Sequence, residues 1–168
     1  MPRRANPGIE ELTPEIWERY FAIFVRAPVM LTRATLPLMH NSGFGRIINN
    51  TTSYLTMLRV LPYGSAKAAL ESMSAVWAKE VEGSAITVNV LVPGGPTDTP
   101  MISDQAGWPR EKMLRPGIMG PPILWLVSDD SAGFNGSGPR PPAGTPRFRP
   151  RRQPSGPRVA GAIGRRYG

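Results

Sequence analysis

The chain has 168 residues, enough for one domain of ordinary size, and a formal net charge of +8. It has no cysteine and one histidine, His40, which excludes disulfides, thiolate metal sites and metal sites built from several histidines. Its 20 prolines and 18 glycines are many for a compact domain that is 40% hydrophobic, so we expect a folded part joined to an unfolded part.

The positive charge lies at the C-terminal end of the chain. Residues 138–168 hold eight arginines and no acidic residue, so the twelve remaining basic residues are balanced by the twelve acidic residues. This segment is rich in proline and glycine and has no stretch that could bury enough apolar surface to offset chain entropy. We therefore predict a folded part over residues 1–137 and a disordered basic tail over residues 138–168.

An arginine-rich tail can bind nucleic acid through the backbone phosphates, which makes nucleic acid a partner to consider. Only Phe148 and Tyr167 of this tail could stack on bases, however, and residues 1–137 carry no net charge. Nucleic acid is therefore an unfavoured partner.

Neither a signal peptide nor a membrane segment is expected. The N-terminal stretch, "MPRRANPGIEEL", lacks the apolar core of a signal peptide. The unbroken apolar runs of the chain are far shorter than the ~20 residues that cross a bilayer. We therefore expect a cytoplasmic protein.

The first predicted element is a long helix over residues 14–39. Thr13 can cap its start, and Pro14 suits the first helical position. From there "EIWERYFAIFVRAPVMLTRATLPLM" is apolar at helical spacing. Pro28 is expected to kink this helix rather than end it.

Two strands and two further helices are predicted after it. A loop, "NSGFG", precedes a short strand, "RIINN", and the connection "TTSYLTMLRVLP" leads to a second helix over about residues 62–82. "AITVNVLV" is a buried strand of the parallel type, "PGGPTDTPM" is the loop at its carboxyl end, and "PPILWLVSDDS" is a short helix. This alternation predicts an α/β fold with a parallel sheet. Two strands do not make a stable sheet, so either the sheet is incomplete or its other strands come from elsewhere.

The helix that begins "PYGSAKAALESM" carries a candidate catalytic pair. Tyr63 and Lys67 are four residues apart and therefore point the same way from a helix. An ammonium beside a phenol favours the phenolate, and lowering the pKa of a tyrosine from about 10 to about 7 requires roughly 4 kcal/mol. A tyrosine tuned in this way acts as a general acid and base at neutral pH. By itself the spacing is also common by chance in helices.

Three motifs occur in order along the chain: "GRIINNTTS", "YGSAKAALE" and "AKEVEGSAITVNVLVPGGPTDTPM". Together they resemble the C-terminal half of the short-chain dehydrogenase/reductase family. In that family a G-[RK]-I-[IV]-N strand leads to a catalytic Ser or Thr, and a Y-x-x-x-K helix and an I-x-V-N-x-x-x-P-G strand and loop follow. The resemblance covers about residues 13–137. It implies an incomplete Rossmann-like, doubly wound parallel sheet that lacks the N-terminal nucleotide-binding strands.

The resemblance implies three catalytic residues. Tyr63 would donate a proton to a substrate carbonyl, and Lys67 would bind the nicotinamide ribose and lower the pKa of Tyr63. Thr52 would orient the substrate through its hydroxyl, with Ser53 as the alternate.

The implied cofactor is NAD or NADP, and no metal is implied. Besides Tyr63 and Lys67, the contacts would come from the loop after the buried strand, since ligands of open α/β sheets bind at the carboxyl ends of strands. Its backbone would approach the nicotinamide and a threonine would bond to the carboxamide, which assigns cofactor-binding roles to Pro93, Gly94, Gly95 and Thr97 or Thr99.

Four features depart from the family pattern. The family's glycine-rich turn between a strand and a helix, which holds the pyrophosphate, has no counterpart here, because "NSGFGR" leads into a strand. Phe24 stands where the family has an Asn that completes a proton relay. Thr52 and Tyr63 are about two residues closer than usual, and the arginine-rich tail after Ser137 replaces the closing strand. We therefore expect weak cofactor binding and little or no activity from this chain by itself.

The resemblance implies an NAD(P)-dependent oxidoreductase that acts on a small carbonyl or alcohol. Met101, Ile102 and Trp108 make the expected substrate loop apolar, which suggests a hydrophobic substrate. The alternative is a non-catalytic remnant or interaction module. Such a module would associate with itself, or with a full-length relative, through helices 14–39 and 62–82, which face a second subunit in the family.

Overall fold

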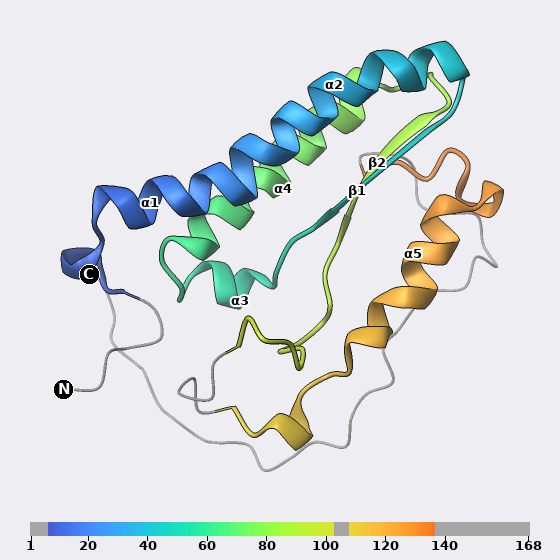
Figure 1. Ribbon diagram of the computed structural model, residues 1–168. Coiled ribbons are helices and arrows are strands. Elements are labelled where there is room, and N and C mark those ends of the chain that lie inside the picture. The colour runs from blue at the N-terminus through green and yellow to red at the C-terminus, as the bar shows by residue number, and fades with distance from the viewer. Residues whose placement is uncertain (1–6, 103–107, 137–168) are drawn as a thin grey trace, which may run out of the picture.

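The computed structural model describes residues 7–102 and 108–136 (Figure 1). The prediction of a disordered tail over residues 138–168 therefore lies outside the described residues, as does part of the loop after the second strand. Short 3-10 turns and one π-helical turn aside, the elements in chain order are α1 (Pro14–Phe21), α2 (Ala27–Ser42), β1 (Gly45–Asn50), α3 (Tyr54–Met57), α4 (Tyr63–Glu80), β2 (Ile86–Leu91) and α5 (Gly120–Val127).

Helices α1 and α2 form one continuous helix, Pro14–Ser42, which begins where the sequence predicts. The Thr13 hydroxyl caps it by accepting a hydrogen bond from the N–H of Ile16 at 3.4 Å. Residues Ala22–Arg26 form a π-helical turn in its middle. Pro28 follows closely and has no N–H to donate. The π-helical turn therefore lies next to the position where one backbone hydrogen bond of the helix is absent. The helix thus continues through Pro28, as predicted.

This helix is also longer and more apolar than the sequence reading anticipates. Its 29 residues make it the one helix of the described residues that is long and apolar enough to cross a membrane by length and composition. Polar residues interrupt the apolar stretches of this helix, so the length of unbroken apolar runs does not reveal it in the sequence. Helices of soluble proteins meet the same criterion, and the cytoplasmic location stays a prediction.

Strands β1 and β2 lie side by side and run parallel, with Ile47 opposite Val88, so the described residues form a two-stranded sheet. The loop before β1 is shorter than predicted, because α2 runs to Ser42 and Gly43 ends it in the left-handed conformation (φ 66°). The predicted α/β alternation and the predicted parallel pairing are confirmed. The core between sheet and helices consists of Ile47, Ala78, Val81, Ile86 and Val88, with Leu36, Met39 and Trp77 packed against it.

Helix α4 begins one residue after the predicted start and buries one face against the sheet. Before it, the connection contains a short helix, α3, that the sequence analysis misses; the Ser53 hydroxyl caps α3 by accepting from the N–H of Thr56. Helices α3 and α4 approach closely at Gly64, where a Cβ would lie 2.4 Å from the carbonyl oxygen of Met57. This contact fixes where the first turn of α4 sits.

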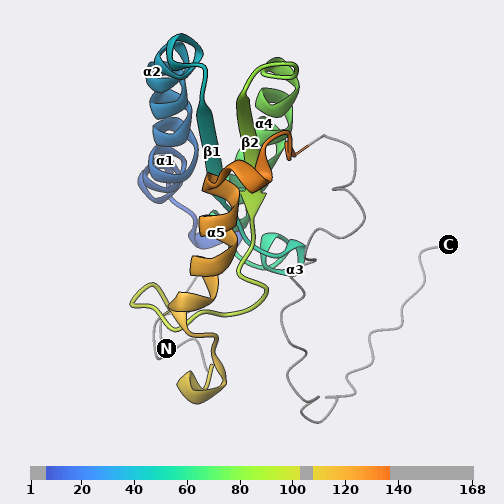
Figure 2. The same cartoon turned by 90° about the vertical axis from the view of Figure 1, so that its right-hand side faces the viewer.

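The sheet lies between two helical layers, with α1, α2 and α4 on one side and α5 on the other (Figures 1 and 2). After α5 the chain returns to the free edge of β2. There the Asn135 side chain accepts from the N–H of Val88 at 2.9 Å and donates to the carbonyl of Ala78 at 2.7 Å. The N–H of Gly136 donates to the carbonyl of Val88 at 3.0 Å. Asn135 and Gly136 therefore bond to the outward-facing N–H and carbonyl of Val88 at the outer edge of β2.

Candidate active site

The candidate side chains gather where β1 ends and α4 begins. Asn50 is the last residue of β1, Thr52 follows two residues later, and Tyr63 and Lys67 come from the first two turns of α4. The Nζ of Lys67 donates a hydrogen bond to the backbone carbonyl of Asn50 at 2.7 Å. The pair therefore lies at the carboxyl end of the sheet, as the resemblance implies.

Lys67 is almost fully buried, with 7% of the residue exposed. Besides the Asn50 carbonyl, its ammonium faces two aromatic rings, with Nζ 4.6 Å from the ring centroid of Phe24 and 5.7 Å from that of Tyr63. Burial lowers the pKa of Lys67, because the charged form loses hydration. Lys67 is thus an ammonium held by one carbonyl and by aromatic faces.

Tyr63 lies against the same ring. Its own ring meets that of Phe24 edge to face, with the centroids 5.3 Å apart and an interplanar angle of 84°. Burial raises the pKa of Tyr63, a side-chain hydrogen bond with Thr52 lowers it in part, and the nearby Tyr20 raises it further.

This direction corrects the expectation that Lys67 lowers the pKa of Tyr63. The physical reason is that desolvation of the phenolate dominates. The ammonium of Lys67 bonds to a backbone carbonyl and faces the ring of Tyr63 rather than bonding to its oxygen. The phenol therefore stays protonated at neutral pH.

The structure distinguishes between the two candidate hydroxyls. Thr52 is the hydrogen-bond partner of the Tyr63 phenol. Ser53 is committed to α3, since its Oγ lies 3.3 Å from the N–H of Thr56 and 3.1 Å from the hydroxyl of the same residue. Thr52 is therefore the hydroxyl that accompanies Tyr63, although its spacing in the sequence is short.

The predicted cofactor loop after β2 bonds within itself and to the segment around Leu114. The Thr97 hydroxyl donates to the carbonyl of Gly95 at 3.3 Å, and Thr97 forms a bridge with Leu114. The Thr99 carbonyl accepts from the N–H of Ile102 at 3.1 Å. For the described residues, the hydrogen bonds and ring contacts of this loop do not reach Tyr63 or Lys67.

The glycines of this loop serve its own turns. Gly94 has left-handed backbone (φ 87°), which favours glycine. A Cβ on Gly95 would lie 3.3 Å from a methyl group of Leu114, so the close approach that requires glycine is made to this side chain. Pro93, two residues after β2, is half-buried. The structure thus brings Tyr63, Lys67 and Thr52 together, but it does not bring the loop residues into contact with them.

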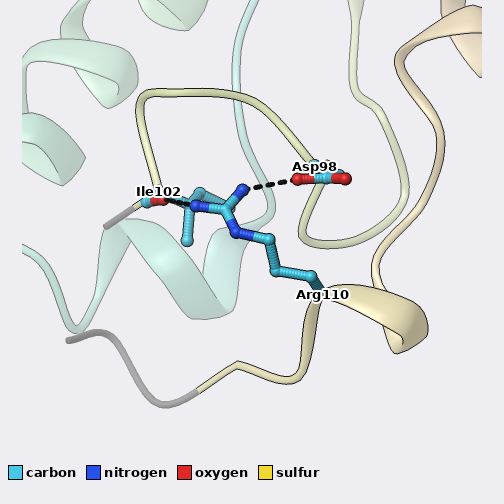
Figure 3. A network of polar contacts seen from close by, with 3 residues as sticks. All are labelled: Asp98, Ile102 and Arg110. Carbon is cyan, nitrogen blue, oxygen red and sulfur yellow. Dashed lines mark hydrogen bonds and ion pairs between the residues drawn. The ribbon is translucent and has the colours of Figure 1, made fainter. Parts of the chain in front are cut away.

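An ion pair ties the two ends of the following loop together (Figure 3). Arg110 bonds to the carboxylate of Asp98 and donates to the carbonyl of Ile102 at 2.9 Å. Sequence reasoning misses this pair, because opposite charges twelve residues apart follow no local pattern. Met101 and Trp108, which were expected to shape a substrate pocket, are exposed beside this network.

A hollow of about 380 Å³ opens between α3 and α4, close to Thr52. Neither Tyr63 nor Lys67 lines it, so the hollow and the catalytic pair do not coincide. The perturbed phenol of Tyr63 and the buried ammonium of Lys67 therefore lie outside this surface groove. Its lining residues are Thr52, Ser53, Tyr54, Met57, Ala68, Glu71, Ser72 and Val92.

The fold and the site define the class of protein as an α/β protein with a Rossmann-like parallel sheet and a Tyr–Lys helix at its carboxyl edge. A family model described as short chain dehydrogenase matches residues 4–109. The chain belongs to the short-chain dehydrogenase family.

Similar proteins support this assignment. The uncharacterized oxidoreductase YciK of Escherichia coli is 34% identical over 128 residues, which are 73% of this chain and 49% of that protein. The chloroplastic NADPH-dependent aldehyde reductase 2 of Arabidopsis thaliana is 35% identical over 140 residues, which are 76% of this chain and 51% of that protein. A solved short chain dehydrogenase from Pseudomonas syringae has 31% identity and a TM-score of 0.68, covering 77% of this chain and 54% of that one. The chain thus spans about half the length of these relatives.

The family uses a nicotinamide cofactor, and the residues present fit one end of it. A phenol, an ammonium and a hydroxyl at the carboxyl edge of the sheet suit a ribose and a reacting carbonyl. The described residues offer no comparable fit for a pyrophosphate, because Gly43 and Gly45 end a helix and begin a strand, so no helix N-terminus follows them. A Cβ on Gly45 would lie 2.8 Å from the sulfur of Met39, so packing explains this glycine. Within the described residues, no group of three or more His, Asp or Glu could hold a metal ion.

Proposed function

We propose that the chain is the catalytic portion of an NAD(P)-dependent oxidoreductase in which Tyr63 is the general acid and base. The observation that carries the proposal is the convergence of Tyr63, Thr52 and Lys67 at the carboxyl end of β1. When bound, the nicotinamide supplies or accepts the hydride. The chain's own residues supply the proton and hold the carbonyl.

In the reductive direction, Tyr63 gives its phenolic proton to the carbonyl oxygen of the substrate as the carbonyl carbon becomes an alcohol carbon. The Thr52 hydroxyl, which already bonds to the phenol, orients that oxygen. The phenolate that remains is reprotonated from solvent. The phenol is protonated at neutral pH and can therefore act as the acid in carbonyl reduction.

Lys67 has a binding role in this proposal. Its ammonium holds ribose hydroxyls of the cofactor. The bond to the Asn50 carbonyl fixes the ammonium at the end of β1 before any ligand arrives. The loop residues Pro93, Gly94, Gly95, Thr97 and Thr99 would contact the nicotinamide if the loop rearranged, because their present contacts are internal.

The substrate class we propose is a small hydrophobic carbonyl compound. The apolar Met101 and Trp108 beside the loop support it, and so does the aldehyde reductase among the relatives, whose name also favours NADP. We expect slow turnover from this chain by itself, because the described residues fit the nicotinamide end of the cofactor alone.

The test begins with the purified chain and NADPH or NADH, followed by cofactor fluorescence. Saturable binding is expected in the high micromolar to millimolar range, and its absence up to millimolar cofactor would remove catalysis from consideration. Reduction of short aliphatic and aromatic aldehydes is then followed under excess enzyme. Tyr63→Phe should keep the binding and lose the reduction, whereas Lys67→Met should weaken the binding itself.

The homo-oligomer through helices 14–39 and 62–82 remains part of this proposal. Exposed apolar side chains along the first helix, among them Ile23, Leu31 and Leu38, support it, because a second copy would cover them. Size-exclusion chromatography with light scattering tests it, and a monomer at all concentrations would contradict it.

A further inference from the structure

The ring of Phe24 occupies the centre of the candidate site. It lies on the π-helical turn of residues Ala22–Arg26, which packs against α4. The Nζ of Lys67 lies over the face of this ring, 4.6 Å from its centroid, and the ring of Tyr63 meets it edge to face at 5.3 Å. One ring therefore touches both members of the proposed catalytic pair.

We propose that Phe24 is a positioning residue whose aromatic face binds the ammonium of Lys67 and holds it beside Tyr63. The family places a polar side chain at this position, and the sequence therefore implies a lost polar contact. In this chain a cation–π contact takes the place of that polar contact.

The surroundings of Lys67 explain why an aromatic face is needed. An ammonium has three N–H groups, and in the described part of the chain Asn50 provides the carbonyl that accepts from one of them. With 7% of Lys67 exposed, little room is left for water to satisfy the others. A cation–π contact grows stronger as the cation is desolvated, so the ring face offsets part of the hydration that Lys67 loses.

The π-helical turn explains how the ring reaches this place. Such turns widen a helix by one residue and often occur at functional sites. Here the turn holds Phe24 in contact with α4, and Tyr20, one turn earlier on the helix, also packs on this ring, with 5.8 Å between centroids. Phe24 thus contacts the rings of both Tyr20 and Tyr63, which limits its movement over Lys67.

Simple apolar packing is the competing explanation, and it predicts different behaviour. A packing side chain of equal volume would serve as well as an aromatic one, and the charge on Lys67 would not depend on the electron density of the ring. A cation–π contact requires that density.

The decisive experiment changes the electron density of the ring and leaves its shape nearly constant. Phenylalanine analogues with one, two or three ring fluorines are incorporated at position 24, and the pKa of Lys67 is measured by NMR of its labelled Cε. The chain has two other lysines, Lys79 and Lys112, and both are exposed, so they report any general change. We expect the pKa of Lys67 to fall stepwise with each fluorine, by about half a unit to one unit in total, while Lys79 and Lys112 do not move. An unchanged pKa of Lys67 would overturn the proposal.

Conventional variants provide a second measurement that does not depend on the analogues. Phe24→Leu keeps an apolar side chain but has no ring, and should lower the pKa of Lys67, whereas Phe24→Tyr should restore it. Phe21→Leu is the matched control, because Phe21 lies on the same helix and stacks on Trp17. If Phe24→Leu raised the pKa of Lys67, the ring would act only as a cover against water, and the proposal would be wrong.

The catalytic meaning of this contact rests on the function proposed above, but the contact can be measured without it. A response of Lys67 to fluorination in a chain that reduces no aldehyde would support the positioning of Lys67 and remove the proposed function. Aldehyde reduction without such a response would support the function and overturn the role of Phe24.

Discussion

The first turns of α4 and the loop after β2 carry the two halves of the predicted site, and they are held in different ways. Lys67 and Tyr63 are fixed by contacts with other elements, namely the end of β1 and the π-helical turn. Thr97 and Gly95 make their contacts within the loop or with Leu114. Side chains that a rigid helix presents to other elements are already in place for chemistry, whereas loop residues that satisfy one another must first exchange those contacts.

The substitution Tyr63→Phe is the strongest test of this difference between the helix and the loop. We expect a loss of about 10²–10⁴-fold in the rate of carbonyl reduction, because the proposed general acid is removed. The ring that packs on Phe24 is kept, so folding should be unaffected. The measurement is single-turnover reduction of an aldehyde by NADPH, with circular dichroism to check the fold.

The matched loop variant is Thr97→Val, which removes a hydroxyl that bonds to the loop's own Gly95 carbonyl. It should change the same rate by no more than about threefold, within the range of ~0.5 kcal/mol typical of such sites. Equal losses in Tyr63→Phe and Thr97→Val would show that the loop is as much a part of the working site as the helix.

A second prediction separates Thr52 from its neighbour. Thr52→Val should slow the reduction by about ten- to hundredfold, because the hydroxyl proposed to orient the carbonyl is lost. It should also raise the pKa of Tyr63 further, since the hydrogen bond from Thr52 lowers it. Ultraviolet titration of the tyrosines and single-turnover kinetics measure the two effects.

Ser53→Ala is the control for that prediction. It removes the cap of α3 and should cost about 1 kcal/mol of stability, with little change in rate or in the pKa of Tyr63. A slower reaction in Ser53→Ala than in Thr52→Val would exchange the roles of the two hydroxyls.

Local patterns in the sequence predict the elements of this fold well. The helix start at Thr13, the two parallel strands and the Tyr63 helix all depend on residues within a few positions of one another. Helix α3 is missed, because its four residues depend on the cap by Ser53 and not on a periodic pattern.

The site is predicted less completely than the fold. Sequence motifs identify Tyr63, Lys67 and Thr52, but the direction of the Tyr63 pKa depends on burial and on Tyr20, which is more than forty residues away in the chain. The contact between Gly95 and Leu114 could not be predicted either, because it joins residues that are far apart in the chain. Contacts between distant segments determine both properties, and a single sequence does not display them.

A third prediction tests how firmly α4 is placed. Gly64→Ala would bring a Cβ to 2.4 Å from the Met57 carbonyl oxygen. Because the helix backbone fixes the Cβ and the oxygen is itself a backbone atom, the first turn of α4 must shift. We expect a loss of about 1–3 kcal/mol in the free energy of unfolding, measured by urea denaturation. Gly117→Ala, where a Cβ would meet nothing within 4 Å, should be neutral within about 0.5 kcal/mol. Equal effects of the two variants would contradict the close approach of α3 and α4.

A fourth prediction concerns the stability of the buried ammonium as a function of pH. Burial lowers the pKa of Lys67 from its ordinary value of 10.5, so the unfolded chain holds this proton more tightly than the folded chain. Below both pKa values the charge therefore lowers stability. Lys67→Met should raise the melting temperature at pH 7 by roughly a few degrees, and the gain should shrink as the pH rises toward and above 10.5. Lys79→Met, at an exposed site, should show no such change, and a gain independent of pH would point to packing instead.

The smallest effect is expected at the Asp98–Arg110 ion pair, which joins two ends of the loop after β2 (Figure 3). Both side chains are more than 40% exposed, at 45% for Asp98 and 42% for Arg110, so water and salt screen their attraction. A double-mutant cycle with Asp98→Ala and Arg110→Ala should give a coupling of about 0.2–1 kcal/mol that decreases in high salt. The backbone of Leu114 also bonds to the backbone of Pro96 and Asp98. We therefore expect these backbone bonds to keep the two ends of the loop together without the ion pair. A coupling of several kcal/mol that salt does not change would instead make this ion pair the main support of the loop. The contrast between a helix fixed by its neighbours and a loop fixed by its own backbone bonds would then no longer hold.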